Sequence, residues 1–216
     1  RSPLKELSYR YVMTNSPDLR GIDVALLYQR DLFKLLSSRS ISIPPLKQYR
    51  PTRDLLHVSG LLLTGDTLDV FVCHLPSRSG GAKESESYRL YAAHILRMEV
   101  DSIMNIRSLP QVIIMGDFND YPTNQSIQKI LEAEAYKYRG EWGLLDHLIV
   151  SGTLLNQSNH FFTSEEKANV CLLPFLLKDD EKYGDKEPFR TYKGMKYQGG
   201  VSDHLPIYAD FELILY

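Results

Sequence analysis

The sequence predicts an α/β sandwich in which two mixed, mainly antiparallel β-sheets pack face to face and helices lie outside them. Two observations predict this fold class. Short apolar runs of strand length recur along the chain, with turn residues between them. One longer segment, from Ser85 to about Arg107, instead carries apolar residues at the three- and four-residue steps of an amphipathic helix.

The apolar runs have the length and the residue types of β-strands. They are Tyr9–Met13, Asp23–Tyr28, Leu55–Leu63, Leu68–Leu75, Val112–Met115, Leu144–Val150 and Ile207–Leu213. Residues 64–67 separate the third run from the fourth and include Gly65, which predicts a hairpin turn. Strands joined by such a turn pair antiparallel, and this favours an antiparallel sheet.

Two helices are expected to cover sheet faces. The first is the segment 85–107, and the second runs from Thr123, an N-cap that follows Pro122, to about Glu134. The segment 178–188 is charged and shows no periodicity, so we expect an exposed loop there. Such a loop could shape access to a substrate, and a solvated insertion explains it equally well.

Length and composition limit the classes of protein that the chain can belong to. Its 216 residues are 43% hydrophobic, so we expect one domain over residues 1–216 and a monomer. The net charge of −2 argues against a strongly basic nucleic-acid binder but leaves a local basic cleft open. No apolar run reaches the roughly 18 residues of a membrane helix, so the chain as given is expected to be soluble.

Polar side chains with catalytic chemistry stand at several strand ends. In GDFND (116–120), Asp117 and Asn119 should project to one side and Phe118 to the other. A carboxylate and an amide aimed at one point suit a metal-bound water or the oxygen that leaves a phosphate. Asp and Asn are also common in turns after strands, so a structural role explains this motif about as well.

His74 ends another strand, and the small polar loop after it contains Ser77 and Arg78. The imidazole could donate to a phosphoryl oxygen, and Arg78 or Lys83 could supply positive charge. We therefore interpret Ser77 and Arg78 as substrate-binding residues. The structural alternative is a core histidine beside a flexible loop.

Two further strand ends carry acidic residues. Asp146 lies among Leu, Ile and Val, where a carboxylate is costly to bury without a partner. Asp203 and His204 form an adjacent pair before the strand expected from Ile207, and His204 is the partner we expect for Asp146. His147 should face away from Asp146 because neighbouring strand residues alternate.

These motifs, in this order, make the sequence resemble the endonuclease/exonuclease/phosphatase superfamily. That group includes pancreatic-type deoxyribonucleases, apurinic/apyrimidinic endonucleases, inositol polyphosphate phosphatases and bacterial sphingomyelinases. The resemblance covers nearly the whole chain, and it is carried by GIDVALLYQRDLF, CHLPSRSGG, GDFND, WGLLDHLIVS and GVSDHLPIYADF. It implies a four-layer, DNase-like α/β sandwich.

The resemblance also implies a role for each site residue. Asp203 would lie beside a divalent metal, His204 would contact the scissile phosphate, and Asp146 would orient His204. Asp117 and Asn119 would orient the attacking water or assist the leaving group, and His74 would contact a phosphate oxygen. The implied chemistry is hydrolysis of a phosphoester by in-line attack of water, with Mg²⁺ or Mn²⁺ as the cofactor.

One feature of the family pattern is missing. Members carry a metal-binding Glu in an early strand or helix, and no comparable segment precedes or follows Arg1 closely. We therefore expect an N-terminally incomplete domain, with the principal Glu upstream and weak Mg²⁺ binding by the chain as given. A signal peptide of a secreted or periplasmic protein would also precede Arg1, so localisation is left open.

The substrate is expected to be a phosphoester, with nucleic acid as one candidate. GEWGLLD (140–146) lacks the surroundings of the orienting Asp in the lipid-phosphatase branch, and His74 replaces the Tyr of the apurinic-endonuclease branch. A nuclease or phosphodiesterase and a small-phosphoester phosphatase therefore stay open. The alternative from another class is a binding or scaffold module that keeps the fold with little or no catalysis.

Overall fold

The computed structural model describes residues 7–47, 49–131, 144–182 and 184–215. The chain divides into two compact units. The larger unit comprises Arg1–Phe162 and Glu212–Tyr216, and the smaller unit comprises Thr163–Phe211. None of the helices within the described ranges is both long enough and apolar enough to cross a lipid bilayer.

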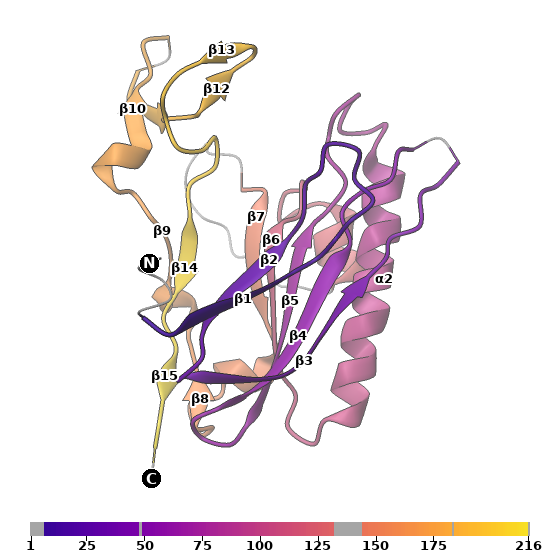
Figure 1. Ribbon diagram of the computed structural model, residues 1–216, viewed down its shortest axis with the longest axis vertical. Helices are drawn as coiled ribbons and strands as arrows, with labels where there is room; N and C mark the ends of the chain where they lie inside the picture. The colour runs from indigo at the N-terminus through magenta and orange to yellow at the C-terminus, as the bar shows by residue number, and fades with distance from the viewer. Residues whose placement is uncertain (1–6, 48, 132–143, 183, 216) are drawn as a thin grey trace. The chain divides into compact units, whose positions relative to one another are not determined.

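The larger unit is built on a five-stranded mixed sheet with the strand order β3-β4-β5-β6-β7 (Figure 1). The strands are β3 (Phe33–Ile41), β4 (Leu55–Leu62), β5 (Thr67–His74), β6 (Gln111–Asp117) and β7 (Asp146–Val150). β5 and β6 run parallel, and the other neighbouring pairs run antiparallel. Parallel neighbours need a crossover connection, and here it contains the helix α2 (Glu86–Ile106).

The core lies between α2 and the sheet, which α2 flanks along its length (Figure 1). Apolar side chains of the helix and of the central strands form one buried cluster. It includes Tyr88, Ala92, Ala93, Leu96 and Ile103 from α2 and Phe71, Cys73, Val112 and Ile114 from β5 and β6. β4 and β5 have buried residues on both faces, so they form the centre of the unit.

Two antiparallel pairs complete the larger unit. β1 (Tyr9–Met13) pairs with β2 (Ala25–Gln29), and β2 contacts β4. β8 (Phe161–Phe162) pairs with β15 (Glu212–Leu213). A short 3₁₀ helix, Gly152–Leu155, follows β7.

The smaller unit consists of short strand pairs and two 3₁₀ turns. β9 (Ala168–Val170) pairs with β14 (Ile207–Ala209), β10 (Leu177–Asp179) with β11 (Lys186–Pro188), and β12 (Tyr192–Lys193) with β13 (Lys196–Tyr197). The 3₁₀ turns are Glu165–Lys167 and Pro174–Leu176. A second large sheet is not among the described elements, so the four-layer sandwich stays a prediction.

Most expected elements of the larger unit are present. The helix 85–107 and the hairpin turn at 64–67 are confirmed, and the turn contains Gly65 with φ of 85°. β3 was not predicted, because its middle reads Ser-Ser-Arg-Ser and lacks an apolar pattern. This strand lies at the edge of the sheet, where polar side chains can face solvent while the backbone pairs with β4.

Three expectations were wrong in detail. The second helix is described as one π-helical turn, Ser126–Ile130, in which the Leu131 N–H donates to the Ser126 carbonyl at 3.2 Å. The part of that helix expected at 132–134 lies outside the described residues. The charged segment 178–188 forms most of the β10–β11 hairpin, and the strand expected over 207–213 divides into β14 and β15, each with a different partner.

Candidate functional site

Three neighbouring strands of the sheet bring their polar ends into register. The parallel pairing of β5 with β6 places His74 opposite Asp117. The antiparallel pairing of β6 with β7 places Asp117 opposite Asp146. Three residues that were predicted separately from the sequence therefore lie across adjacent strands, where the ends of these strands meet.

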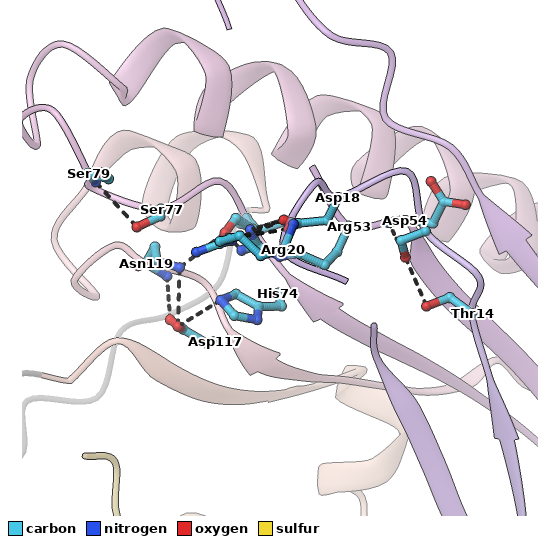
Figure 2. Close-up of polar contacts among 12 residues, drawn as sticks. Thr14, Asp18, Arg20, Arg53, Asp54, His74, Ser77, Ser79, Asp117 and Asn119 are labelled. Atoms are coloured by element: carbon cyan, nitrogen blue, oxygen red, sulfur yellow. Dashed lines mark hydrogen bonds and ion pairs between the residues drawn. The ribbon is translucent and has the colours of Figure 1, made fainter. Parts of the chain in front are cut away.

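The Asp117–Asn119 turn is closed by its own side chains (Figure 2). Asp117 Oδ1 accepts a hydrogen bond from the Asn119 backbone N–H at 2.8 Å, and Asp117 Oδ2 accepts one from Asn119 Nδ2 at 3.1 Å. Asn119 has φ of 52°, a left-handed conformation that Asn tolerates better than most residues. Phe118 is fully buried between them, so the predicted opposite orientation is present.

His74 faces the same carboxylate. Its Nε2 lies 3.4 Å from Asp117 Oδ2, and the side chains are 29% and 16% exposed, respectively. Figure 2 shows the imidazole pointing at Asp117. An imidazole and a carboxylate that are both partly exposed can exchange protons with a bound molecule.

Gly116 allows β6 to approach β5 closely at this point. Its φ is 134°, and a Cβ atom there would lie 1.9 Å from the Cys73 carbonyl oxygen. That distance is far below van der Waals contact with a backbone atom. The Gly that precedes the Asp117 turn is therefore required by the geometry of the strand end.

A buried arginine supports this end of the sheet. Arg53 Nη2 donates to the Leu75 carbonyl at 2.6 Å, and Asn119 Nδ2 donates to the same carbonyl at 3.0 Å. Arg53 Nη1 donates to Asp18 Oδ2 at 3.1 Å, and Arg20 also binds Asp18 through Nε and Nη2. Hydrogen bonds from Arg20 and then from Arg53 hold the pKa of Asp18 well below its usual range, against the effect of burial.

Arg53, Asp18 and Arg20 were not predicted from the sequence as site residues. Arg53 and Asp54 immediately precede β4, whose first six residues are all buried. Charged residues at the start of such a strand are the same kind of signal that identified His74 and Asp117. Applied to strand beginnings as well as strand ends, it would have identified Arg53.

Asp120 anchors the turn from the other side. Asp120 Oδ1 lies 2.7 Å from Nε of Arg89 in α2, and both side chains are 1% exposed. Ser126 Oγ donates a hydrogen bond to Asp120 Oδ2 at 2.7 Å. A ring nitrogen of His147, Nε2, lies 2.8 Å from the Asp120 carbonyl oxygen. Burial lowers the pKa of His147, which favours a neutral ring that donates to this carbonyl.

The predicted substrate-binding residues lie in the loop after β5. The Arg78 guanidinium lies over the Tyr121 ring, with Cζ 4.7 Å from the ring centroid. Ser77 Oγ accepts a hydrogen bond from the Ser79 N–H at 3.2 Å. Tyr121 directly follows the GDFND turn, so this cation–π contact joins the loop to that turn.

Asp203 and His204 belong to the smaller unit, where their turn is well held. The His204 N–H donates to Ser202 Oγ at 3.1 Å. A Cβ at Gly200 would lie 2.0 Å from the Phe189 carbonyl oxygen, which explains the Gly before this motif. β14, which follows, is only half-buried, with Tyr208 48% exposed. The pairing of His204 with Asp146 would join the two units and stays a prediction.

The described residues supply donors of the right type for a hard cation, but not a complete site. No group of three or more His, Cys, Asp or Glu side chains that could hold a metal ion occurs among them. Asp117 and Asp146 are neighbours in register and offer carboxylate oxygens. Oxygen ligands of this kind suit Mg²⁺ or Mn²⁺.

Comparison with solved structures supports the fold. The human Nocturnin catalytic domain with bound sulfate matches with a TM-score of 0.58 and 20% identity, covering 98% of this chain and 74% of that chain. A D. rerio TDP2 humanised by 14 mutations matches with a TM-score of 0.58 and 18% identity, covering 96% of this chain and 76% of that chain. ANGEL2, a 2′,3′-cyclic phosphatase, matches with a TM-score of 0.51 and 20% identity, covering 60% of this chain and 37% of that chain. At these identities the matches establish the fold alone.

Comparison of the sequence with protein families shows which family the chain belongs to. No curated protein matched the chain. The model of the Endonuclease/Exonuclease/phosphatase family matches residues 1–137 and 133–213, which together span both units. The chain therefore belongs to the endonuclease/exonuclease/phosphatase family.

Proposed function

We propose that this chain is a divalent-metal-dependent phosphoester hydrolase in which water attacks phosphorus in line. The observation that carries the proposal is the register of His74, Asp117 and Asp146 across three adjacent strands. The buried Asn119 is fixed against Asp117, so an amide lies beside a partly exposed imidazole and carboxylate at this end of the sheet. Phosphoryl transfer depends mainly on positioning and on charge stabilisation, which such a set can supply.

Each residue has a proposed task. Asp117 accepts a proton from, or orients, the attacking water, and Asn119 Oδ1 holds that water or a phosphoryl oxygen. His74 donates to a phosphoryl oxygen, and Ser77 and Arg78 bind the substrate. Asp203 ligates Mg²⁺ or Mn²⁺, and Asp146 orients His204 against the scissile phosphate. The metal, when bound, neutralises negative charge on the phosphoryl oxygens.

The substrate class that we propose is a phosphodiester or phosphomonoester, with nucleic acid as one candidate. ANGEL2 is a 2′,3′-cyclic phosphatase, and the Nocturnin structure holds a sulfate anion, which has the tetrahedral shape of phosphate. Both likenesses concern folds. They support a site for a tetrahedral anion in this chain without choosing among phosphoesters.

Turnover of phosphoesters by the full protein tests the proposal. The substrates would be plasmid DNA, RNA, bis-p-nitrophenyl phosphate, p-nitrophenyl phosphate and sphingomyelin, each with Mg²⁺, Mn²⁺ or EDTA. We expect metal-dependent turnover of at least one, lost in Asp117→Ala and in His204→Ala. Absence of turnover on every substrate would favour a binding or scaffold module with the same fold.

A further inference from the structure

The Arg53 guanidinium is unusually placed for a charged group. Its side chain is 2% exposed, and burial lowers the pKa of Arg53, although the charge on Asp18 opposes that effect. A buried charge is costly unless it is paired and hydrogen-bonded. Asp18 accepts a hydrogen bond from only one of the two terminal nitrogens of Arg53, namely Nη1. Arg53 Nε has no hydrogen-bond partner among the described residues. Neutralisation of Asp18 therefore accounts for only part of this arrangement.

The second terminal nitrogen of Arg53 is directed at the candidate site. Nη2 donates to the Leu75 carbonyl at 2.6 Å, a short, charge-assisted hydrogen bond. Leu75 directly follows His74, and its N–H donates to the Asp117 carbonyl at 2.8 Å. The backbone of one residue, Leu75, thus joins Arg53 to the end of β6 directly after β5 ends. Figure 2 shows Arg53 beside Asn119 and His74.

The Leu75 carbonyl also fixes the orientation of the Asn119 amide. Asn119 Nδ2 donates to Leu75 O at 3.0 Å and to Asp117 Oδ2 at 3.1 Å, so both amide protons have acceptors. The amide oxygen, Oδ1, is then the atom available to a reacting molecule. If the Leu75 carbonyl moved, Asn119 would lose one of the two acceptors that set this orientation.

We infer that Arg53 is a positioning residue for the Asp117–Asn119 turn, acting through the Leu75 carbonyl. Its effect on turnover rests on the proposed function, whereas its effect on the Asn119 amide does not. The rival explanation is that Arg53 only neutralises Asp18. The two explanations differ in what should happen when both charges are removed together.

The structural effect is measured in the metal-free full protein by NMR, using the side-chain amide resonances of Asn119. We expect Arg53→Lys and Arg53→Met to move these resonances. A lysine ammonium cannot bind both Asp18 and Leu75 as a guanidinium does, and a methionine side chain has no donor for either. The matched control is Arg107→Met, which removes another arginine paired with a buried aspartate, Asp69. That control should leave the Asn119 resonances in place. Unmoved resonances in both Arg53 variants would overturn the inference.

The catalytic effect is measured with Arg53→Met alone and with Arg53→Met combined with Asp18→Asn. Loss of a hydrogen-bond partner of a metal ligand typically costs about 10- to 100-fold in activity, and we expect an effect of similar size for Arg53. We expect kcat to fall by about this factor with little change in KM. The double variant should regain most of the lost Tm but not the lost kcat. Recovery of kcat together with Tm would show that Arg53 only neutralises Asp18.

If the unmodified protein shows no turnover, the proposed function fails, and the NMR comparison still decides the role of Arg53.

Discussion

The two ends of the parallel pair β5–β6 use the same kinds of residue in different ways. At the beginning of β5, Asp69 is fully buried and accepts hydrogen bonds from His57 and Arg107. At the other end, Asp117 meets His74 and Asn119, and the imidazole and carboxylate are both partly exposed. An aspartate with a histidine therefore does not by itself mark a functional site. What marks the second end is exposure, because a molecule from solvent can reach those groups.

Electrostatics make the same distinction. Burial alone would raise the pKa of Asp69, but hydrogen bonds from His57, Arg107 and Ser59 outweigh it and lower that pKa to about 2. This buried carboxylate is kept ionised by its hydrogen-bond and ion-pair partners. We expect it to contribute to stability, whereas Asp117 is the carboxylate that we propose acts on a substrate.

The largest expected difference between the two ends is in activity. Asp117→Asn should lower kcat by about 10²- to 10⁴-fold, because the amide cannot act as a base and lacks the charge. The matched variant Asp69→Asn should lower Tm but leave kcat per folded molecule nearly unchanged. Steady-state kinetics on the best substrate, corrected for the folded fraction by circular dichroism, checks both. An equal loss of kcat in the two variants would contradict the comparison.

The glycines near the two ends should differ in their effect on stability. Gly116→Ala should cost more than about 3 kcal/mol, because positive φ and a clash with a backbone carbonyl act together. Gly65, in the turn before β5, also has positive φ, but a Cβ there meets nothing within 4 Å. Gly65→Ala should therefore cost only about 1 kcal/mol. Urea denaturation measures both, and similar midpoints would show that the strand end can relax around a methyl group.

The smallest expected effect concerns acid. The pKa of Asp69 lies below its ordinary value of 3.8, so the unfolded chain takes up this proton first as the pH falls. The stability that this group contributes is present above about pH 4 and is lost as the pH falls towards 2. The loss should be roughly 2 kcal/mol. Unfolding free energies of the unmodified protein should therefore fall more steeply than those of Asp69→Asn over this interval, and parallel curves would contradict the assignment.

Much of the larger unit could be predicted from the sequence because its strands are apolar runs and α2 has a clear period. β3 was missed because an edge strand needs few apolar side chains when its backbone pairs with β4. The turn at Ser126–Ile130 was overestimated in length, since the propensity of its residues does not fix where a helix ends. Pairing partners that are distant in sequence leave no local pattern.

In the candidate site, too, the residues with a local sequence signal could be predicted and the contacts between distant segments could not. His74, Asp117 and Asn119 could be predicted because each follows an apolar strand, and their register confirms that the first two lie side by side. Arg53 precedes a buried strand and could have been identified from that position, but its contact with Asp18 joins two loops that lie far apart in the sequence and depends on three-dimensional packing. No property of either residue in isolation indicates that contact.

The crossover through α2 has a consequence for how the candidate site forms during folding. His74 ends β5 before the helix begins, and Asp117 ends β6 after the helix is complete. The contact between them is therefore non-local, and it forms only when the intervening chain has closed into a loop. A chain still emerging from the ribosome holds His74 without its acceptor until β6 has docked. Onset of turnover during refolding should accordingly not precede completion of this strand–helix–strand unit, and formation of α2 alone should not suffice for it.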